Sequence, residues 1–260
     1  EETGMEDMEN YFKKNPLPDM AFTPDSDYGI CFAEKGILQL EVSTLLNNAT
    51  TLSQFHAGRA VNAVPDRAYV MLDSSDYDEQ TLMRLADASD GDFEFNYGLM
   101  IISRGKAAHA CEPDKGYNAA AALVDLISNV YTTKETGSIC SFIDYAINKE
   151  TNGRSLGLKM SDAVSGSLTV NLSSVNIEGQ TAKAVFDIRY PVTVSGNRVL
   201  KQFKKVAKIS DLKVTVLNHE EPLYADKDSK LVKLLSDAYE SVTGEKAELY
   251  STGGGTYARM

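Results

Sequence analysis

Residues 167–190 read SLTVNLSSVNIEGQTAKAVFDIRY. Two apolar, β-rich runs, Ser167–Ile177 and Ala182–Tyr190, flank the turn-forming letters EGQ, a pattern that predicts a β-hairpin. In the second run the apolar residues at 184, 186, 188 and 190 share one face, because successive side chains of a strand point to opposite sides. Arg189 is therefore predicted to point away from the apolar, helix-covered side.

The chain around this hairpin repeats the order strand, strand, helix, strand. The remaining strands and the helices of this region are predicted at Ile37–Ser43, Ala60–Leu72, 78–87 (a helix), Leu99–Ser103, Asn118–Val130 (a helix), Asn197–Ala207 (a helix) and Leu212–Leu217. This order predicts two related α+β halves, each a sheet with helices on one side.

The two ends of the sequence have a different pattern, that of a wound α/β fold. Thr3 and Glu6 form a capping box for a first helix, and a short apolar strand is predicted at Met20–Thr23. A late helix with apolar residues from Leu231 to Val242 precedes a predicted strand at Ala247–Tyr250. The fold class expected is therefore α/β ends enclosing an α+β middle.

Composition narrows the classes of function. The 260 residues are 43% hydrophobic and 24% charged, as in ordinary globular proteins. The net charge of −11 argues against binding to nucleic acid, and no apolar run reaches the roughly 20 residues that a membrane span requires. Three widely spaced cysteines form neither a disulfide framework nor a zinc-finger pattern, which favours a reducing, cytoplasmic location.

Several polar motifs stand at predicted loops, and each has an ordinary structural interpretation. Glu1 and Glu2 could stabilise a helix dipole, and Asp25 follows Pro24 as in an Asx turn. His109 lies among small residues, and three consecutive glycines close the sequence in a loop that could bind an anion or simply turn.

Taken together, the motifs resemble a known family. They are EETG (1–4), FTPDSDYGICFAEKG (22–36), GRAVNAVPD (58–66), RGKAAHACEPDKGYNA (104–119), DIRYP (187–191) and STGGGTYAR (251–259). In this order and spacing the chain resembles the dinuclear zinc metallopeptidases of the aminoacylase and carboxypeptidase G type, and most closely their β-Ala-Xaa (carnosinase-like) dipeptidase branch.

The resemblance implies a role for each matched position. Glu1 matches the general base, His109 the donor that polarises the scissile carbonyl, and Glu2 and Asp25 carboxylate ligands of the two zincs. The residues that match substrate-binding positions are Asn62, Arg189, Gly253, Gly254, Gly255 and Thr256.

The resemblance also implies a division of the chain. Residues 1–33 and 221–260 would belong to the zinc-binding catalytic domain, and 34–220 to an inserted lid of two ferredoxin-like halves, about 34–110 and 160–220, with helices between them. The family's His-x-Asp pair, its bridging Asp and its last His match no residue here. We therefore expect an internal portion of a longer enzyme, inactive and without zinc by itself.

The expected function is zinc-dependent hydrolysis of dipeptides by a full-length enzyme with two zincs per subunit, for which manganese or cobalt could substitute. The expected partner is a dipeptide, with no nucleic acid or membrane, and the enzyme would be a monomer or a homodimer through the lid. Two alternatives stay open: an N-acyl amino-acid deacylase of the same family, and a non-catalytic α+β interaction module.

Overall fold

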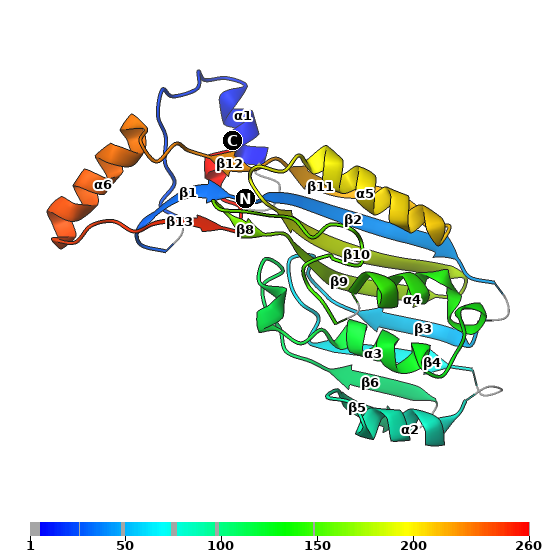
Figure 1. The fold of residues 1–260 in the computed structure, drawn as a ribbon. Coiled ribbons are helices and arrows are strands. Elements are labelled where there is room, and N and C mark those ends of the chain that lie inside the picture. The colour runs from blue at the N-terminus through cyan, green and yellow to red at the C-terminus, as the bar shows by residue number, and fades with distance from the viewer. Residues whose placement is uncertain are drawn as a thin grey trace.

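A computed structural model of the chain describes residues 6–25, 27–47, 50–73, 77–96, 99–147 and 149–259. Its main feature is one antiparallel sheet of eight strands in the order β11-β2-β10-β9-β3-β4-β6-β5 (Figure 1). The strands are β2 (Gly36–Leu45), β3 (Leu52–Ala57), β4 (Arg67–Leu72), β5 (Asp92–Asn96), β6 (Met100–Arg104), β9 (Thr169–Glu178), β10 (Thr181–Tyr190) and β11 (Lys213–Glu220).

The predicted hairpin is confirmed as β9 and β10, near the middle of this sheet. Glu178 pairs with Thr181, so the loop between them is only two residues long. Gly179 takes the left-handed conformation (φ 57°), which glycine adopts without a steric penalty and which short hairpin turns require.

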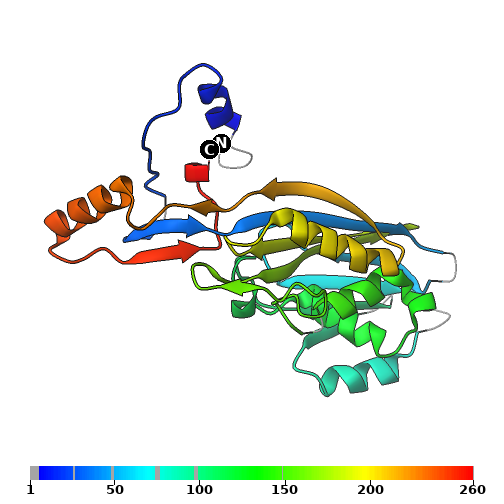
Figure 2. The ribbon, with the colours of Figure 1, turned by 45° about the horizontal axis from the view of Figure 1, so that its top comes forward.

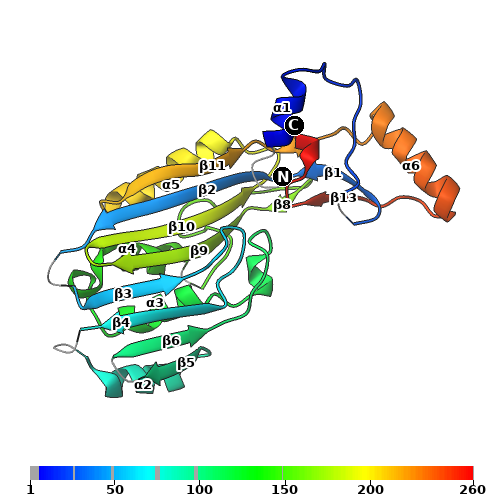
Figure 3. The same cartoon turned by 180° about the vertical axis from the view of Figure 1, so that it is seen from behind.

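Four helices cover one face of the sheet, and the other face carries none of them (Figures 1 and 3). These helices are α2 (Glu79–Asp87), α3 (Ala119–Ser128), α4 (Thr133–Ile147) and α5 (Gly196–Ile209). Between helices and sheet, Phe142, Phe186 and Phe203 meet edge to face with ring centroids 5.4 to 5.7 Å apart. The apolar face predicted for β10 is thus the face that is buried under the helices.

The two predicted halves do not form separate sheets in the structure. β3 pairs with β9, which joins β3, β4, β6 and β5 to the other four strands in one continuous sheet. β2 comes from the first half of the sequence, yet it pairs with β10 and β11 of the second. The strands that pair with one another are therefore not the strands that follow one another in the sequence, because β2 lies among the strands of the second half.

A second, smaller sheet lies at one end of the first (Figure 2). In the order β12-β1-β13 it contains β1 (Ile30–Glu34), β12 (Leu223–Tyr224) and β13 (Leu249–Thr252), with β13 parallel to β1. The other elements are α1 (Glu6–Phe12), η2 (Pro113–Lys115), β7 (Ser161–Asp162), β8 (Gly166–Ser167), α6 (Lys230–Thr243) and η3 (Tyr257–Arg259). The chain passes between the two sheets at Lys35, and again at Glu221 and Pro222.

Two of the predicted strands are corrected by the structure. Of the strand expected at Ala60–Leu72, only Arg67–Leu72 forms, because residues 60–66 make a turn and a loop before the strand begins. The strand expected at Met20–Thr23 is an exposed, unpaired segment, since none of the strands of the described chain lies beside it. The residues Thr3 and Met5 of the expected first helix lie outside the described residues, and α1 is described from Glu6.

Candidate functional site at the junction of the two sheets

Two loops of the large sheet pair with each other and bring Asn62 beside His109. The amide of Ala110 donates to the carbonyl of Asn62 (2.9 Å), and Ala63 and His109 form a β-bridge. From β9, the Asn171 side chain donates to the carbonyl of Ala63 (2.9 Å), which anchors the first loop to the sheet. Sequence motifs more than 40 residues apart therefore form one local structure.

The imidazole of His109 is held in one tautomer by the turn that follows it. The backbone N–H of Cys111 donates to His109 Nδ1 (3.2 Å), and the Cys111 thiol lies 2.9 Å from the same nitrogen. Nδ1 is thus the acceptor, and the proton of the neutral ring is on Nε2. Partial burial, followed by the nearby charge of Arg189, lowers the pKa of His109 and favours this neutral form.

Arg189 occupies a buried position next to this histidine. Its side chain is 4% exposed, and both Nε and Nη2 donate to the carboxylate of Asp187, the latter at 2.8 Å. Gln39 on the neighbouring strand also donates to Asp187 (2.9 Å). The remaining nitrogen, Nη1, donates to the carbonyl of Gly253 (2.9 Å) and so links the large sheet to the glycine loop.

The glycine loop also touches the histidine loop directly. A Cβ atom added at Gly253 would lie only 2.6 Å from the Cβ of Cys111, which is too close for two carbon atoms. The two loops can therefore approach this closely only because residue 253 is a glycine. Thr256, at the end of the loop, donates through its hydroxyl to Glu34 of β1 (2.6 Å). Three predicted segments therefore converge at the junction: the histidine loop, the Arg189 strand and the glycine loop.

The predicted zinc-binding positions are not part of this convergence. Glu1 and Glu2 lie outside the described residues. Asp25 is exposed in the segment before β1 and bonds to none of the other described side chains. Within the described ranges, no group of three His, Cys, Asp or Glu side chains is arranged to hold a metal ion. The residues described here do not by themselves fit a zinc centre.

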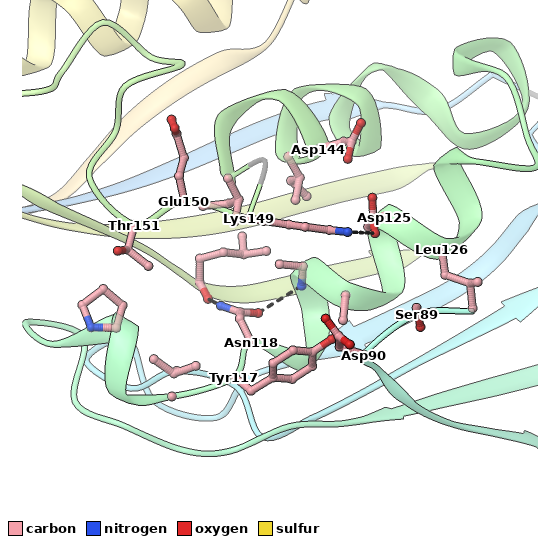
Figure 4. Close-up of a pocket in the computed structure, with 18 of the residues that line it drawn as sticks. Ser89, Asp90, Tyr117, Asn118, Asp125, Leu126, Asp144, Lys149, Glu150 and Thr151 are labelled. Atoms are coloured by element: carbon pink, nitrogen blue, oxygen red, sulfur yellow. Dashed lines mark hydrogen bonds and ion pairs between the residues drawn. The ribbon is translucent and has the colours of Figure 1, made fainter. Parts of the chain in front are cut away.

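A hollow with a volume of about 640 Å³ lies elsewhere, between the helices and the sheet (Figure 4). Its wall carries Asp90, Asp125, Asp144 and Glu150, and Lys149 Nζ lies 3.2 Å from a carboxylate oxygen of Asp125. Burial, followed by the charge of Asp125, raises the pKa of Asp144. None of the predicted site residues lines this hollow.

Four residues at the junction had no role assigned from the sequence: Glu34, Cys111, Asp187 and Arg259. A signal for Asp187 was present, because residues two apart on a strand share a face and an Asp would meet Arg189 there. Glu34 and Arg259 stood in the quoted motifs AEKG and GGGTYAR. Their partnership joins positions 225 residues apart, so only the folded chain reveals it.

Over its full length the chain is similar to bacterial dipeptidases. It is 31% identical to "Putative dipeptidase YtjP" of Bacillus subtilis and covers 58% of that protein. It is also 31% identical to the beta-Ala-Xaa dipeptidase of Lactobacillus delbrueckii subsp. lactis and covers 57% of it. The resemblance to dipeptidases drawn from the motifs is thus confirmed, for a chain that spans a little over half the length of these relatives.

Comparisons with protein-family models and with solved structures do not narrow the class of protein further. No protein-family model matches the chain. Among solved structures, aminoacylhistidine dipeptidase from Vibrio alginolyticus has a TM-score of 0.45 at 14% identity, over 87% of this chain and 52% of that one. In the described part of the chain, no helix is long and apolar enough to cross a membrane.

Proposed function

We propose that the full-length protein is a metal-dependent dipeptidase that requires a free carboxylate at the C-terminus of its substrate. The observation that carries this proposal is the convergence of His109, Arg189 and the glycine loop at the junction of the two sheets. A neutral donor, a guanidinium and backbone N–H groups are the groups that an amide carbonyl, a carboxylate and a peptide backbone would need. The similarity to dipeptidases supports the same class.

In this proposal His109 donates from Nε2 to the oxygen of the scissile carbonyl. Because Nδ1 already accepts from Cys111, the ring is oriented before the substrate arrives. The lowered pKa of His109 keeps the ring neutral, so its Nε2 proton is a hydrogen-bond donor without a charge to desolvate. The histidine thus stabilises negative charge where it develops on the oxygen.

Arg189 recognises the substrate carboxylate, and Asn62 lies in the adjacent loop to bind the same half of the substrate. Asp187 holds two nitrogens of the guanidinium and leaves the Nη1 edge facing the glycine loop. A substrate carboxylate would replace the Gly253 carbonyl on Nη1. The exchange substitutes a charged acceptor for a neutral one, which strengthens the hydrogen bond.

The catalytic base Glu1, the ligands Glu2 and Asp25 and the two zincs are part of this proposal. The described residues do not provide a metal centre, because no three His, Cys, Asp or Glu side chains among them are grouped to hold an ion. Residues 34–220, which contain the eight-stranded sheet, are proposed as the lid, and residues 1–33 and 221–260, which contain the small sheet except Glu34, as parts of the catalytic domain. We place the enzyme in the cytoplasm, in keeping with its three free thiols.

The test compares a dipeptide with its own C-terminal amide, using purified full-length protein supplied with zinc. We expect hydrolysis of the dipeptide and a loss of at least about 100-fold in kcat/KM for the amide, because Arg189 would lose its charged partner. Equal rates on the two compounds contradict the carboxylate clamp. Faster hydrolysis of an N-acyl amino acid would identify a deacylase instead, and no hydrolysis with zinc bound would favour an interaction module.

A further inference from the structure

Arg259 is a buried arginine whose side chain bonds to several separate segments of the chain. Its side chain is 6% exposed, and Nε donates to a carboxylate oxygen of Glu34 at 2.6 Å. Glu34 is itself buried at the end of β1. A buried guanidinium and carboxylate are costly to desolvate, and they persist only where further hydrogen bonds satisfy both groups.

The other nitrogens of Arg259 bond to the backbone at both places where the chain passes between the sheets. Nη2 donates to the carbonyl of Lys35 (2.6 Å), in the link between β1 and β2. Nη1 donates to the carbonyl of Glu221 (3.1 Å), in the link between β11 and β12. One side chain therefore connects both crossings.

The same guanidinium also bonds to the glycine loop. Nη2 donates to the carbonyl of Gly254 (2.9 Å), and Thr256 donates to Glu34 through both its hydroxyl (2.6 Å) and its N–H (3.2 Å). The loop is thus fixed by Arg259 in its middle and by Glu34 at its end. The crossings and the loop cannot shift independently while these bonds remain.

The packing around the crossings is similarly close. A Cβ at Gly36 would lie 2.0 Å from the ring of Tyr190, so this ring covers the start of β2. The hydroxyl of Tyr190 lies 3.0 Å from His219 Nε2 and donates to the carbonyl of Glu220 (3.2 Å). The crossings therefore have a defined geometry, to which Arg259 attaches the loop.

We propose that Arg259, with Glu34, is a positioning residue that sets the glycine loop against His109 and Arg189. The inference rests on the proposed function, because the loop is taken to bind the substrate backbone. Arg259 does not touch the substrate in this proposal. It acts through Gly254, whose neighbour Gly253 contacts both Cys111 and Arg189.

The shape of the guanidinium explains why arginine stands here. Its donors point in three directions in one plane and donate to the Glu34 carboxylate and three carbonyls, and Nη1 also lies 3.7 Å from a carboxylate oxygen of Glu220. A lysine ammonium is a compact donor at the end of a flexible stem and would keep the charge without spanning the three carbonyls. Arg259→Lys should therefore retain the fold but lose part of the loop placement.

The experiment uses the full-length enzyme with Arg259→Lys, Arg259→Gln and Arg259→Ala. Arg104→Gln is the matched control, because Arg104 forms an exposed ion pair with Glu94 (2.7 Å) away from the junction. We expect Arg259→Gln to lose roughly 100-fold in kcat/KM, mainly through KM, since misplacing a binding loop by about 1 Å has effects of that size. The kcat/KM of Arg259→Lys should lie between those of Arg259→Gln and the wild type, and the kcat/KM of Arg104→Gln should match that of the wild type.

Two readouts separate positioning from simple loss of stability. Added guanidinium ion should restore part of the lost kcat/KM in Arg259→Ala by occupying the vacated site, which it could not do for a misfolded enzyme. Amide hydrogen exchange of residues 249–259 should speed up at least tenfold in Arg259→Gln, while exchange in β9 and β10 stays unchanged.

Each result decides the inference. Unchanged KM and unchanged exchange in Arg259→Gln overturn it, as does an activity loss that only follows the unfolded fraction without rescue by guanidinium. If the wild-type enzyme hydrolyses no dipeptide, the proposed function fails, and the exchange of residues 249–259 still decides whether Arg259 holds the loop.

Discussion

At the scale of single residues, the junction depends on side chains whose partners fix their orientation. His109 is oriented by the N–H of Cys111, and Arg189 by the carboxylate of Asp187. The ring nitrogen Nε2 of His109 is the one that Cys111 does not engage, and Nη1 of Arg189 donates to the Gly253 carbonyl at the junction. Orientation by a neighbour is what allows a small number of polar groups to act on a substrate without reorganising.

Replacing His109 by alanine in the full-length enzyme should lower kcat by roughly 100- to 1,000-fold, the usual cost of removing one donor to a developing oxyanion. Steady-state kinetics on a dipeptide measures the loss. Metal content and far-ultraviolet circular dichroism should match those of the wild type, because His109 is not a proposed ligand. A variant with nearly normal kcat would show that His109 has only a structural role.

The protonation of His109 can be measured in this chain directly. Because burial lowers its pKa in the folded state, the unfolded chain binds the proton more readily, and stability falls as pH drops from the ordinary histidine pKa through the folded one. NMR titration of the ring protons should give a pKa below the roughly 6.5 of an unperturbed histidine. A value at or above 6.5 would contradict both the burial and the nearby Arg189 charge.

At the scale of elements, the helix α3 is tied to the sheet by its first cap. Asn118 accepts from the N–H of Ala121 (3.0 Å), which satisfies a free donor of the first turn. The same side chain donates to the carbonyl of Leu172 on β9 (2.8 Å). One residue therefore both begins a helix and fixes it on a strand distant in sequence.

Asn118→Ala should lower the free energy of unfolding by about 1–3 kcal/mol, because it removes a helix cap and leaves the Leu172 carbonyl with one partner fewer. Asn118→Ser keeps a capping oxygen but cannot reach Leu172, and should recover about half of the loss. Urea unfolding of the three proteins measures the difference. Equal stability of the alanine variant and the wild type would mean that the cap contributes nothing here.

At the scale of the whole molecule, two sheets of different kinds meet at two chain crossings. The large sheet has its own core, formed with α2, α3, α4 and α5. The small sheet consists of three short strands, with α6 beside β1 (Figures 1 and 2). The proposed active site lies where they meet, so the relative position of the sheets determines whether its groups converge.

This 260-residue chain by itself should bind no pair of zinc ions tightly and should not hydrolyse dipeptides. Zinc takes about four ligands in proteins, and the positions matched here supply only Glu2 and Asp25, one for each metal. Dialysis against zinc followed by elemental analysis and a dipeptidase assay checks this. Two tightly bound zincs per chain, with turnover, would overturn the residue assignments.

Sequence patterns predict the hairpin, several other strands and helices, and the class of relatives, whereas β1, β3, β5 and α4 have no counterpart among the predicted elements. Alternation in residues 182–190 and the glycine after Glu178 were enough for the hairpin, because strand periodicity and turn chemistry act over a few residues. The motif order was enough for the resemblance to dipeptidases. The hairpin depends on neighbouring residues, and each motif is itself a short run, although the six motifs together extend from residue 1 to residue 259.

The contacts that those residues make depend on the packing of distant parts of the chain. Arg189 was expected on a face away from the helices, but its burial against Asp187 and its bond to Gly253 depend on a loop 64 residues later. The strand β2 crosses from one predicted half to the other, and Arg259 meets Glu34 across 225 residues. Such contacts follow from the packing of whole sheets, and no periodicity along the chain encodes which distant residues that packing brings together.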